Sequence, residues 1–184
     1  MGGNSSVEIN GNAGSNLIIR NSGDNTITGF AGNDTLNGGG GADTLEGRSG
    51  NNALNGGGGN DTLNGLAGND ALNGGGGNDT LEGRSGNDTL NGGAGNDTLS
   101  GNGSNDVFVF TGAFGNDVIT DFEATNANED IDLSGVASIF GINDLINNHM
   151  SQVGSNVVID DLGGNTITLQ NVNIADLDAS DFIF

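Results

Sequence analysis

Residues 92–100 read GGAGNDTLS, and a nine-residue unit of this form recurs in phase along most of the chain. Twelve copies follow one another over residues 2–109, and a thirteenth, residues 112–120, comes after a two-residue insertion. Counted from the first Gly of the unit, position four is almost always Gly, position six is usually Asp and position eight is always a large apolar residue. The copies before residue 29 are degenerate. A strict period of nine with one large apolar residue in each unit predicts a coil of stacked repeats.

Each unit combines a strand signal with a turn signal. Positions seven to nine are expected to form a short strand with the apolar side chain of position eight inward. The six Gly-rich residues before them, which end in Asn-Asp, are typical of a tight turn with positive φ angles. If two units make one coil, the strands of every second unit stack about 4.8 Å apart in two parallel sheets. One sheet is expected to hold the strands centred on Ile27, Leu45, Leu63, Leu81, Leu99 and Ile119, and the other those centred on Ile18, Leu36, Leu54, Leu72, Leu90 and Phe108.

Composition excludes several classes of protein. The 184 residues include 37 Gly and no Cys, and 24 acidic residues face three basic ones, for a formal net charge of −21. A disulfide framework and a thiolate metal site are therefore excluded, and nucleic acids and anionic membranes are unfavourable partners. No apolar run approaches the roughly 20 residues of a membrane-spanning helix, and residues 1–10 lack the basic and apolar regions of a cleaved signal peptide.

Catalytic motifs are missing from the sequence as well. It contains no HExxH, GxSxG or GxxxxGK[ST] pattern. His149 is the only histidine, and it is expected on a helix as a surface or half-buried residue. The chain is therefore predicted not to be an enzyme.

The repeat needs a further source of stability. One buried apolar side chain contributes roughly 2–3 kcal/mol, and ordering nine residues costs several times more. Stacked coils also bring the position-six carboxylates together, where they repel one another. A hard divalent cation between the turns would both stabilise the coil and neutralise the repelling carboxylates. Ca²⁺ is better suited than Mg²⁺, because it accepts six to eight oxygen ligands in loose geometry.

On these residues the chain resembles the RTX family, whose nonapeptide is GGxGxDxUx. The resemblance covers residues 11–120 and implies an all-β fold, a right-handed parallel β-roll that binds calcium between successive turns. It implies about five to eight Ca²⁺ ions, held by position-six side chains and by main-chain carbonyls of positions two and four. The expected side-chain ligands are Asp34, Asp43, Asn52, Asp61, Asp70, Asp79, Asp88, Asp97, Asp106 and Asp117. The expected carbonyl ligands are those of Gly39, Gly41, Arg48, Gly50, Gly57, Gly59, Leu66, Gly68, Gly75, Gly77, Arg84, Gly86, Gly93 and Gly95.

The sites are not expected to be equal. Sites with Asp on both coils are Asp43/Asp61, Asp61/Asp79, Asp79/Asp97, Asp70/Asp88 and Asp88/Asp106, with Asp97/Asp117 added if the insertion leaves the stack intact. Asn52 lies between Asp34 and Asp70, so its two sites lose a negative charge and are expected to be weaker. The units with Asn16 and Asn25 are expected to continue the coil with poor sites or none.

Periodicity stops after residue 120, and residues 121–184 are expected to form a small mixed α+β cap on the open end of the coil. We expect a helix over residues 141–150, with Asn143 as its cap, and two strands over 156–160 and 165–169 joined by a turn at 161–164. The stretches NDVFVF, NDVITDFEA and DIDLSGV and the terminal DFIF resemble the C-terminal regions of proteins that leave bacteria by type I secretion. Serralysin-type proteases, mannuronan epimerases, lipases and large adhesins carry similar regions.

The first functional hypothesis is a secreted, extracellular module that folds on binding calcium and is exported through a type I apparatus, as the C-terminal part of a larger bacterial enzyme or adhesin. The second is a binding module, either for a polysaccharide, as in epimerase repeats, or for ice through the position-five ladder Asn60, Asn69, Asn78, Asn87 and Asn96. The third is a small extracellular calcium binder. Arg48 and Arg84 are expected on one row two coils apart, where they temper the negative field.

Overall fold

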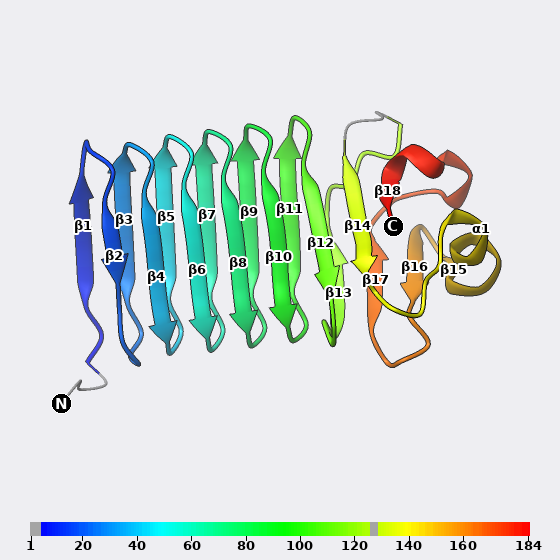
Figure 1. Ribbon diagram of the computed structural model, residues 1–184, viewed down its shortest axis with the longest axis horizontal. Coiled ribbons are helices and arrows are strands. Elements are labelled where there is room, and N and C mark those ends of the chain that lie inside the picture. Colours follow the sequence, from blue (N-terminus) through cyan, green and yellow to red (C-terminus); the bar gives the residue numbers. More distant parts are fainter. Residues whose placement is uncertain (1–4, 126–128) are drawn as a thin grey trace.

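The computed structural model describes residues 5–125 and 129–184. The start of the first repeat copy, residues 2–4, and three residues of the segment after the last copy therefore lie outside the described part. The described chain is a solenoid of two parallel sheets, with a broader C-terminal end (Figure 1).

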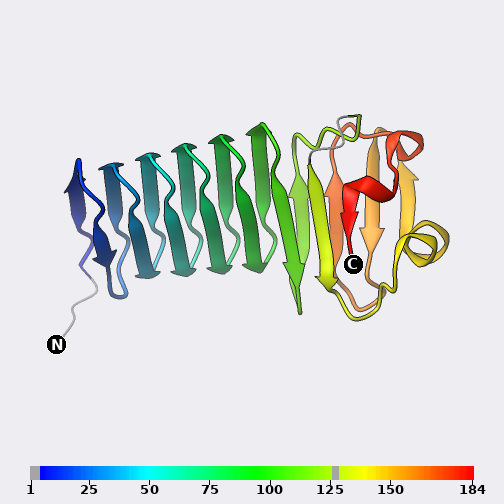
Figure 2. The same cartoon turned by 45° about the horizontal axis from the view of Figure 1, so that its top comes forward.

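Odd-numbered and even-numbered strands of the repeat region lie in different sheets, as Figure 2 shows. The first sheet has the order β1 (Glu8–Asn12), β3 (Thr26–Ala31), β5 (Thr44–Ser49), β7 (Thr62–Ala67), β9 (Thr80–Ser85), β11 (Thr98–Gly103), β13 (Asn116–Ile119), β17 (Thr166–Leu169), β16 (Asn156–Asp160) and β15 (Met150–Val153). The second has the order β18 (Phe182–Ile183), β14 (Asp130–Gly135), β12 (Val107–Thr111), β10 (Thr89–Ala94), β8 (Ala71–Gly76), β6 (Ala53–Gly58), β4 (Thr35–Gly40) and β2 (Leu17–Ile19).

The predicted register is confirmed. Each position-eight residue pairs with the position-eight residue two units later, as Leu63 does with Leu81 in the first sheet and Leu54 with Leu72 in the second. The stack continues across the two-residue insertion, because Leu99 pairs with Ile119. These side chains form two columns inside the coil, and from Ile27 to Ile119 each is at most 2% exposed.

The predicted length of the strands is wrong. Strands in the regular part of the coil have six residues, not three, because they continue from position seven through position three of the next unit. Only positions four to six form the turn. The reason is pairing along the stack: residues of positions two and three also meet their counterparts in the next coil, as Leu66 and Ala67 meet Arg84 and Ser85. Position one of the regular coils therefore lies within the strand and is buried, and a Cβ placed there would meet the position-six carboxylate, as at Gly65 and Asp70.

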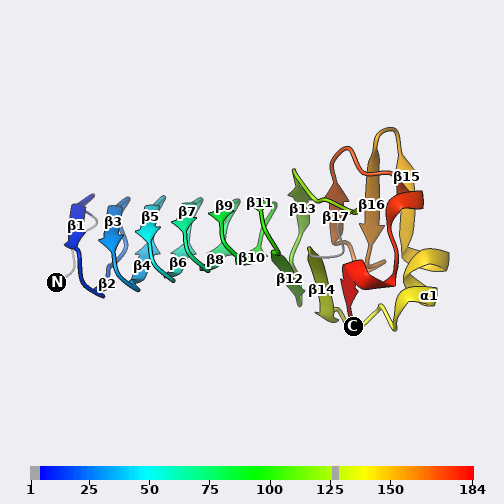
Figure 3. The same ribbon diagram turned by 90° about the horizontal axis from the view of Figure 1, so that it is seen from above.

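The C-terminal region continues both sheets before it closes them. β14 pairs in parallel with β12, and β17 pairs in parallel with β13. The predicted hairpin is present, since β16 pairs antiparallel with β17, and β15 adds a third strand beside β16. Figure 3 shows how this region widens the end of the thin coil.

The predicted helix is shorter and less regular than expected. It consists of α1 (Ile142–Asp144) and a π-helical turn, Leu145–His149, and Gly141 rather than Asn143 occupies the N-cap. Met150 already belongs to β15. Two 3₁₀ turns follow near the C-terminus, Ile174–Asp176 and Ala179–Asp181. None of the helices in the described part of the chain has the length and apolar character needed to span a bilayer.

Candidate metal centre

The position-six aspartates lie inside the coil, at the turns between the sheets. Turns that follow odd-numbered strands line the upper edge of the coil in Figure 1, and turns that follow even-numbered strands line its lower edge. At most 3% of each of these residues is exposed to solvent. The buried set is Asp34, Asp43, Asp61, Asp70, Asp79, Asp88, Asp97, Asp106 and Asp117, and Asn52 is buried with them.

One oxygen of each carboxylate has a structural role. Oδ1 of Asp61 accepts a hydrogen bond from the backbone N–H of Asp43 at 2.7 Å, and Oδ1 of Asp79 accepts one from the N–H of Asp61 at 2.7 Å. The same bond joins the other Asp pairs, and it crosses the insertion as Asp97 N–H to Asp117 Oδ1 at 2.8 Å. Position six therefore fastens each turn to the turn one coil earlier.

The second oxygen lacks such a role. Oδ2 is buried and has no hydrogen-bond partner among the described residues in each of Asp34, Asp43, Asp61, Asp70, Asp79, Asp88, Asp97, Asp106 and Asp117. A buried carboxylate oxygen without a donor is costly, because it has lost its hydration and gained nothing in return. This orphaned atom is the observation that fits a cation at the turns.

Asparagine at position six behaves differently. The Asn52 side-chain amide donates to the carbonyl of Gly50, at position four of the same unit, at 2.9 Å. The Asn25 amide donates to the corresponding carbonyl of Gly23 and, at 2.9 Å, to Oδ1 of Asp43. An aspartate at the same place has an oxygen instead of this donor. In a unit with Asn at position six, the side-chain N–H is thus the hydrogen-bond donor at this place. In a unit with Asp, the Oδ2 at the same place needs a donor or a cation from outside the unit.

Main-chain geometry at positions two and four is compatible with the expected carbonyl ligands. Both positions have positive φ angles, and at position two this holds even for Arg48 (78°) and Leu66 (80°). The carbonyls at these positions are directed along the coil axis: a Cβ on Gly59 would lie 2.2 Å from the oxygen of Gly41 in the preceding coil. Carboxylate and carbonyl oxygens are the donors that Ca²⁺ prefers, so the donor set fits this ion.

Burial perturbs the titration of these carboxyl groups. It raises the pKa of Asp61 and Asp79 to about 6 and that of Asp88 and Asp117 to about 7, against the opposing backbone hydrogen bonds. Repulsion between stacked carboxylates adds to the rise, as from Asp79 and Asp43 at Asp61. The predicted repulsion between neighbouring coils is therefore present.

Acidification is expected to order the calcium-free coil. In the unfolded chain these groups titrate near pH 4, so between about pH 4 and pH 7 the folded coil binds more protons than the unfolded chain. Stabilisation by protonation is complete below pH 4 and is lost as the pH rises through 6 to 7. In calcium-depleted buffer, the strand signal in circular dichroism should be larger at pH 5 than at pH 7.5. An equal or smaller signal at pH 5 would contradict the assigned burial of the carboxylates.

The position-five asparagines stabilise the turns. The N–H of Asn78 donates to Oδ1 of Asn60 at 2.9 Å, and the N–H of Asn96 donates to Oδ1 of Asn78 at 3.0 Å. These bonds run in the direction opposite to those of position six. Because Oδ1 is engaged within the protein, the Asn ladder contributes to the stacking of the coils.

Glu129 was missed by the sequence analysis, since the period ends before it. It is buried, and its Oε2 accepts a hydrogen bond from the N–H of Glu123 at 2.7 Å. Burial raises its pKa to about 7, and the charges of Asp121, Asp106 and Glu123 contribute to the rise. A signal was present in the sequence, because Ile131 and the residues next to it repeat the strand pattern of the unit.

In the described ranges, no three side chains of His, Cys, Asp or Glu gather as a metal cluster.

His149 is buried, not at the surface or half-buried as expected. Only 6% of it is exposed, its Nδ1 lies 2.6 Å from the carbonyl oxygen of Asp160, and its Nε2 lies 3.5 Å from Oδ2 of Asp144. The hairpin of β15 and β16 covers it, which the sequence spacing did not reveal. Its contacts tie the π-helical turn to β16.

Arg48 and Arg84 occupy the same row of the first sheet, as predicted, with Leu66 between them. Each pairs with the glutamate two residues before it: Arg48 with Glu46 at 3.2 Å and Arg84 with Glu82. The positive charges are therefore locally neutralised.

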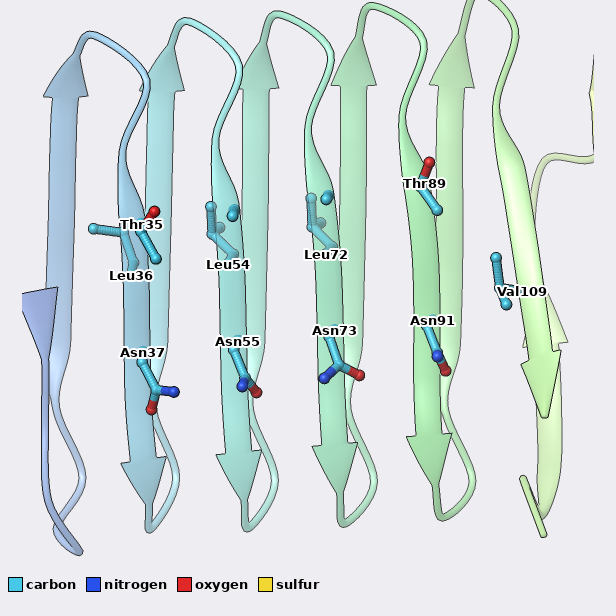
Figure 4. Close-up of a pocket in the computed structure, with 12 residues that line it drawn as sticks. Thr35, Leu36, Asn37, Leu54, Asn55, Leu72, Asn73, Thr89, Asn91 and Val109 are labelled. Carbon is cyan, nitrogen blue, oxygen red and sulfur yellow. The ribbon is translucent and has the colours of Figure 1, made fainter. Parts of the chain in front are cut away.

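The outer face of the second sheet carries a shallow groove of about 480 Å³. Along it, position-nine amides form a row beside position-seven residues (Figure 4). The row consists of Asn37, Asn55, Asn73 and Asn91, with Thr35, Ala53, Ala71 and Thr89 beside it.

Comparison with known proteins agrees with this geometry. A family model described as the RTX calcium-binding nonapeptide repeat (4 copies) matches residues 1–27, 10–45, 46–81, 73–108 and 82–119. A search of curated proteins found no match. Among solved structures, the AlgE6R2 subunit of the Azotobacter vinelandii mannuronan C5-epimerase is similar at 28% identity and a TM-score of 0.52, over 68% of this chain and 88% of that one.

A second solved structure is similar over nearly the whole length of the chain. The extracellular lipase LipA from Serratia marcescens has 20% identity and a TM-score of 0.56, over 98% of this chain. The chain spans only 40% of the lipase. At this identity the likeness concerns the fold.

Proposed function

This chain belongs to the family of RTX calcium-binding nonapeptide repeat proteins, and from that premise we propose that calcium switches its folding and that it serves as the export module of a secreted protein. It is a calcium-binding repeat module that resembles repeats of a secreted lipase and of an epimerase. We further propose that it is the C-terminal part of a larger bacterial enzyme or adhesin and has no catalytic role of its own.

The buried, unpartnered Oδ2 of the position-six aspartates supports the calcium-dependent folding in this proposal. Six pairs have Asp on both coils, and each is joined by the N–H to Oδ1 bond: Asp43/Asp61, Asp61/Asp79, Asp79/Asp97, Asp97/Asp117, Asp70/Asp88 and Asp88/Asp106. Two more pairs contain Asn52. The proposed number of ions is therefore about five to eight.

Calcium would provide the free energy that the thin interior lacks. Without it, unneutralised carboxylates line both edges and the two apolar columns cannot offset the entropy of the chain. With it, the free energy of binding becomes free energy of folding. Extracellular calcium modules typically bind at about 10⁻⁴–10⁻³ M, far above cytosolic calcium. The module would stay unfolded inside the cell, as passage through a secretion channel requires, and fold outside.

Circular dichroism tests the switch directly. In EGTA the repeat region should give the spectrum of an unfolded chain, and a calcium titration should produce the strand signal in a steep transition near millimolar calcium. Magnesium at the same concentrations is the matched control and should not replace calcium. A strand signal that is complete in EGTA and unchanged by calcium would refute the switch.

The replacement Asp79→Asn tests the sharing of ions between stacked coils. Asp79 lies between Asp61 and Asp97, so the substitution removes a charge from two Asp/Asp sites while it keeps the Oδ1 acceptor. Asp34→Asn is the control, because its neighbours Asn16 and Asn52 are already uncharged. The calcium midpoint should rise more for Asp79→Asn than for Asp34→Asn, by about tenfold, or about 1.4 kcal/mol. Equal shifts would show that the ions are not shared.

A second candidate function, binding of a polysaccharide, is favoured by the groove on the second sheet. Asn37, Asn55, Asn73 and Asn91 present amides at a regular interval along it, which suits a neutral chain with a repeating pattern of hydroxyl groups. An anionic glycan is disfavoured, because no basic residue of the described chain lines the groove and because Arg48 and Arg84 lie on the first sheet, paired with glutamates. Affinity electrophoresis at millimolar calcium, with a neutral or an anionic polysaccharide in the gel, tests this function. The neutral polysaccharide should retard the protein, and the absence of retardation by either polysaccharide would exclude the function.

A further inference from the structure

The parallel stacking of the second sheet continues from the last nonapeptide strand, β12, into β14. Val107, Phe108 and Val109 of β12 pair in parallel with Asp130, Ile131 and Asp132 of β14. This is the register that positions seven, eight and nine keep between successive repeats, and Ile131 is fully buried like the Leu and Ile residues of the two columns. The residue before Asp130 therefore stands at position six of an additional coil. That residue is Glu129.

The main chain next to Glu129 keeps one hydrogen bond of the regular coils. The N–H of Asp130 donates to the carbonyl of Asp106 at 2.9 Å, just as the N–H of Val107 donates to the carbonyl of Asp88 at 2.9 Å. Glu129 is 1% exposed and Asp106 is 0% exposed. Asp106 and Glu129 thus occupy successive position-six places of the second sheet, although the Oε2 of Glu129 accepts the N–H of Glu123.

Asp106 has an oxygen available for this pair. Its Oδ1 accepts the N–H of Asp88 at 2.8 Å, whereas its Oδ2 is buried without a hydrogen-bond partner in the described chain. A Cβ placed on Gly101 would lie 2.3 Å from this Oδ2, which puts the orphaned oxygen directly against Gly101. The carboxylate of Asp121 binds the N–H of the same Gly101 at 3.2 Å. Negative charge therefore accumulates at one end of the coil.

Cations from the chain do not neutralise this charge. The three basic residues are Arg20, Arg48 and Arg84, and all of them belong to earlier coils. Asp121 is already satisfied by Ser100 Oγ at 2.6 Å and by Asn102 N–H at 2.7 Å, so it adds negative potential without offering a free oxygen. A bound cation would compensate the ionised, buried pair.

We propose that Asp106 and Glu129 hold a divalent cation that fastens β14, and with it the C-terminal region, onto the last repeat coil. Calcium is the expected ion, and this inference rests on the proposed calcium binding of the repeat. The two carboxylates would supply its side-chain ligands, with Asp106 Oδ2 as the oxygen that has no hydrogen-bond partner in the described chain. The consequence is that calcium binding also couples the docking of the C-terminal region to the folding of the coil.

Calcium counting by native mass spectrometry, with calorimetry alongside, tests this site in the full chain. Glu129→Gln removes the charge and keeps the side-chain length and the acceptor for the Glu123 N–H. It should bind one ion fewer at a calcium concentration that saturates the wild-type chain, with the strand signal of the repeat region intact. Asp106→Asn should lose two ions, since Asp106 also belongs to the Asp88/Asp106 site. Glu123→Gln, an exposed neighbour, is the matched control and should keep all of them.

The outcomes separate this site from the proposed function. An unchanged ion count in Glu129→Gln, with a raised calcium midpoint in Asp79→Asn, overturns the terminal site and leaves the calcium switch standing. Collapse of the whole coil in Glu129→Gln also overturns it, because a site at the end of an array acts on its nearest neighbours only. A wild-type chain that binds no calcium overturns the proposed function itself.

Discussion

The Leu81→Asp chain is expected to remain unfolded in its repeat region at any calcium concentration. Leu81 is fully buried in the first sheet, between Leu63 and Leu99. The substitution removes about 2–3 kcal/mol of apolar burial and places an unpaired carboxylate in the interior at a cost of several kcal/mol more. Together these approach the roughly 5–15 kcal/mol by which a typical domain is stable.

The control for Leu81→Asp is the same change of charge one residue earlier. Thr80 is exposed on the outer face of β9, so Thr80→Asp should fold with a calcium midpoint close to that of the wild type, within about 0.5 kcal/mol. Circular dichroism across a calcium titration compares the two variants. Folding of Leu81→Asp at millimolar calcium would contradict the prediction that the coil needs an intact apolar column to fold.

Gly74→Ala is expected to abolish calcium-dependent folding or to raise the calcium midpoint by at least about tenfold. Gly74 occupies position one, where an added Cβ would lie 2.4 Å from Oδ2 of Asp79 and 2.5 Å from the carbonyl oxygen of Gly92. A real Cβ cannot approach a backbone oxygen this closely, so the stacked coils would have to separate. The methyl group would also crowd the orphaned oxygen that we assign to the metal.

Gly76→Ala is the matched control in the same strand. Apart from Gly76 and its two neighbours in the sequence, no heavy atom of the described chain lies within 4 Å of a Cβ placed on Gly76. The alanine should therefore be tolerated. It should raise the free energy of unfolding by about 0.4–1 kcal/mol, because it lowers the conformational entropy of the unfolded chain. Thermal unfolding at saturating calcium, together with the calcium midpoint, measures both effects. Equal behaviour of the two variants would contradict the packing of position one against the carboxylates.

The regular part of the molecule could be predicted because its interactions repeat with the sequence. Position-eight residues such as Leu63 and Leu81 recur at a constant interval, and only one way of stacking buries all of them. The same interval aligns Asp61 with Asp79, so the rows of candidate ligands follow from the period. The distinction between Asp and Asn at position six could also be read directly, and the structure adds its physical meaning through the amide of Asn52.

The irregular parts could not be predicted, because they depend on contacts between residues that the period does not relate. The burial of His149 results from β15 and β16 folding over the π-helical turn, and the six-residue strands result from pairing of positions two and three along the stack.

The sequence by itself determined the two-unit coil, the register of both sheets and the rows of acidic residues, because a strict period leaves a single arrangement that buries every large apolar side chain. Only the tertiary structure decided that one carboxylate oxygen fastens the turns while the other has no partner. It alone aligned Glu129 with Asp106, because a longer loop breaks the period and only the pairing of β14 with β12 restores the register.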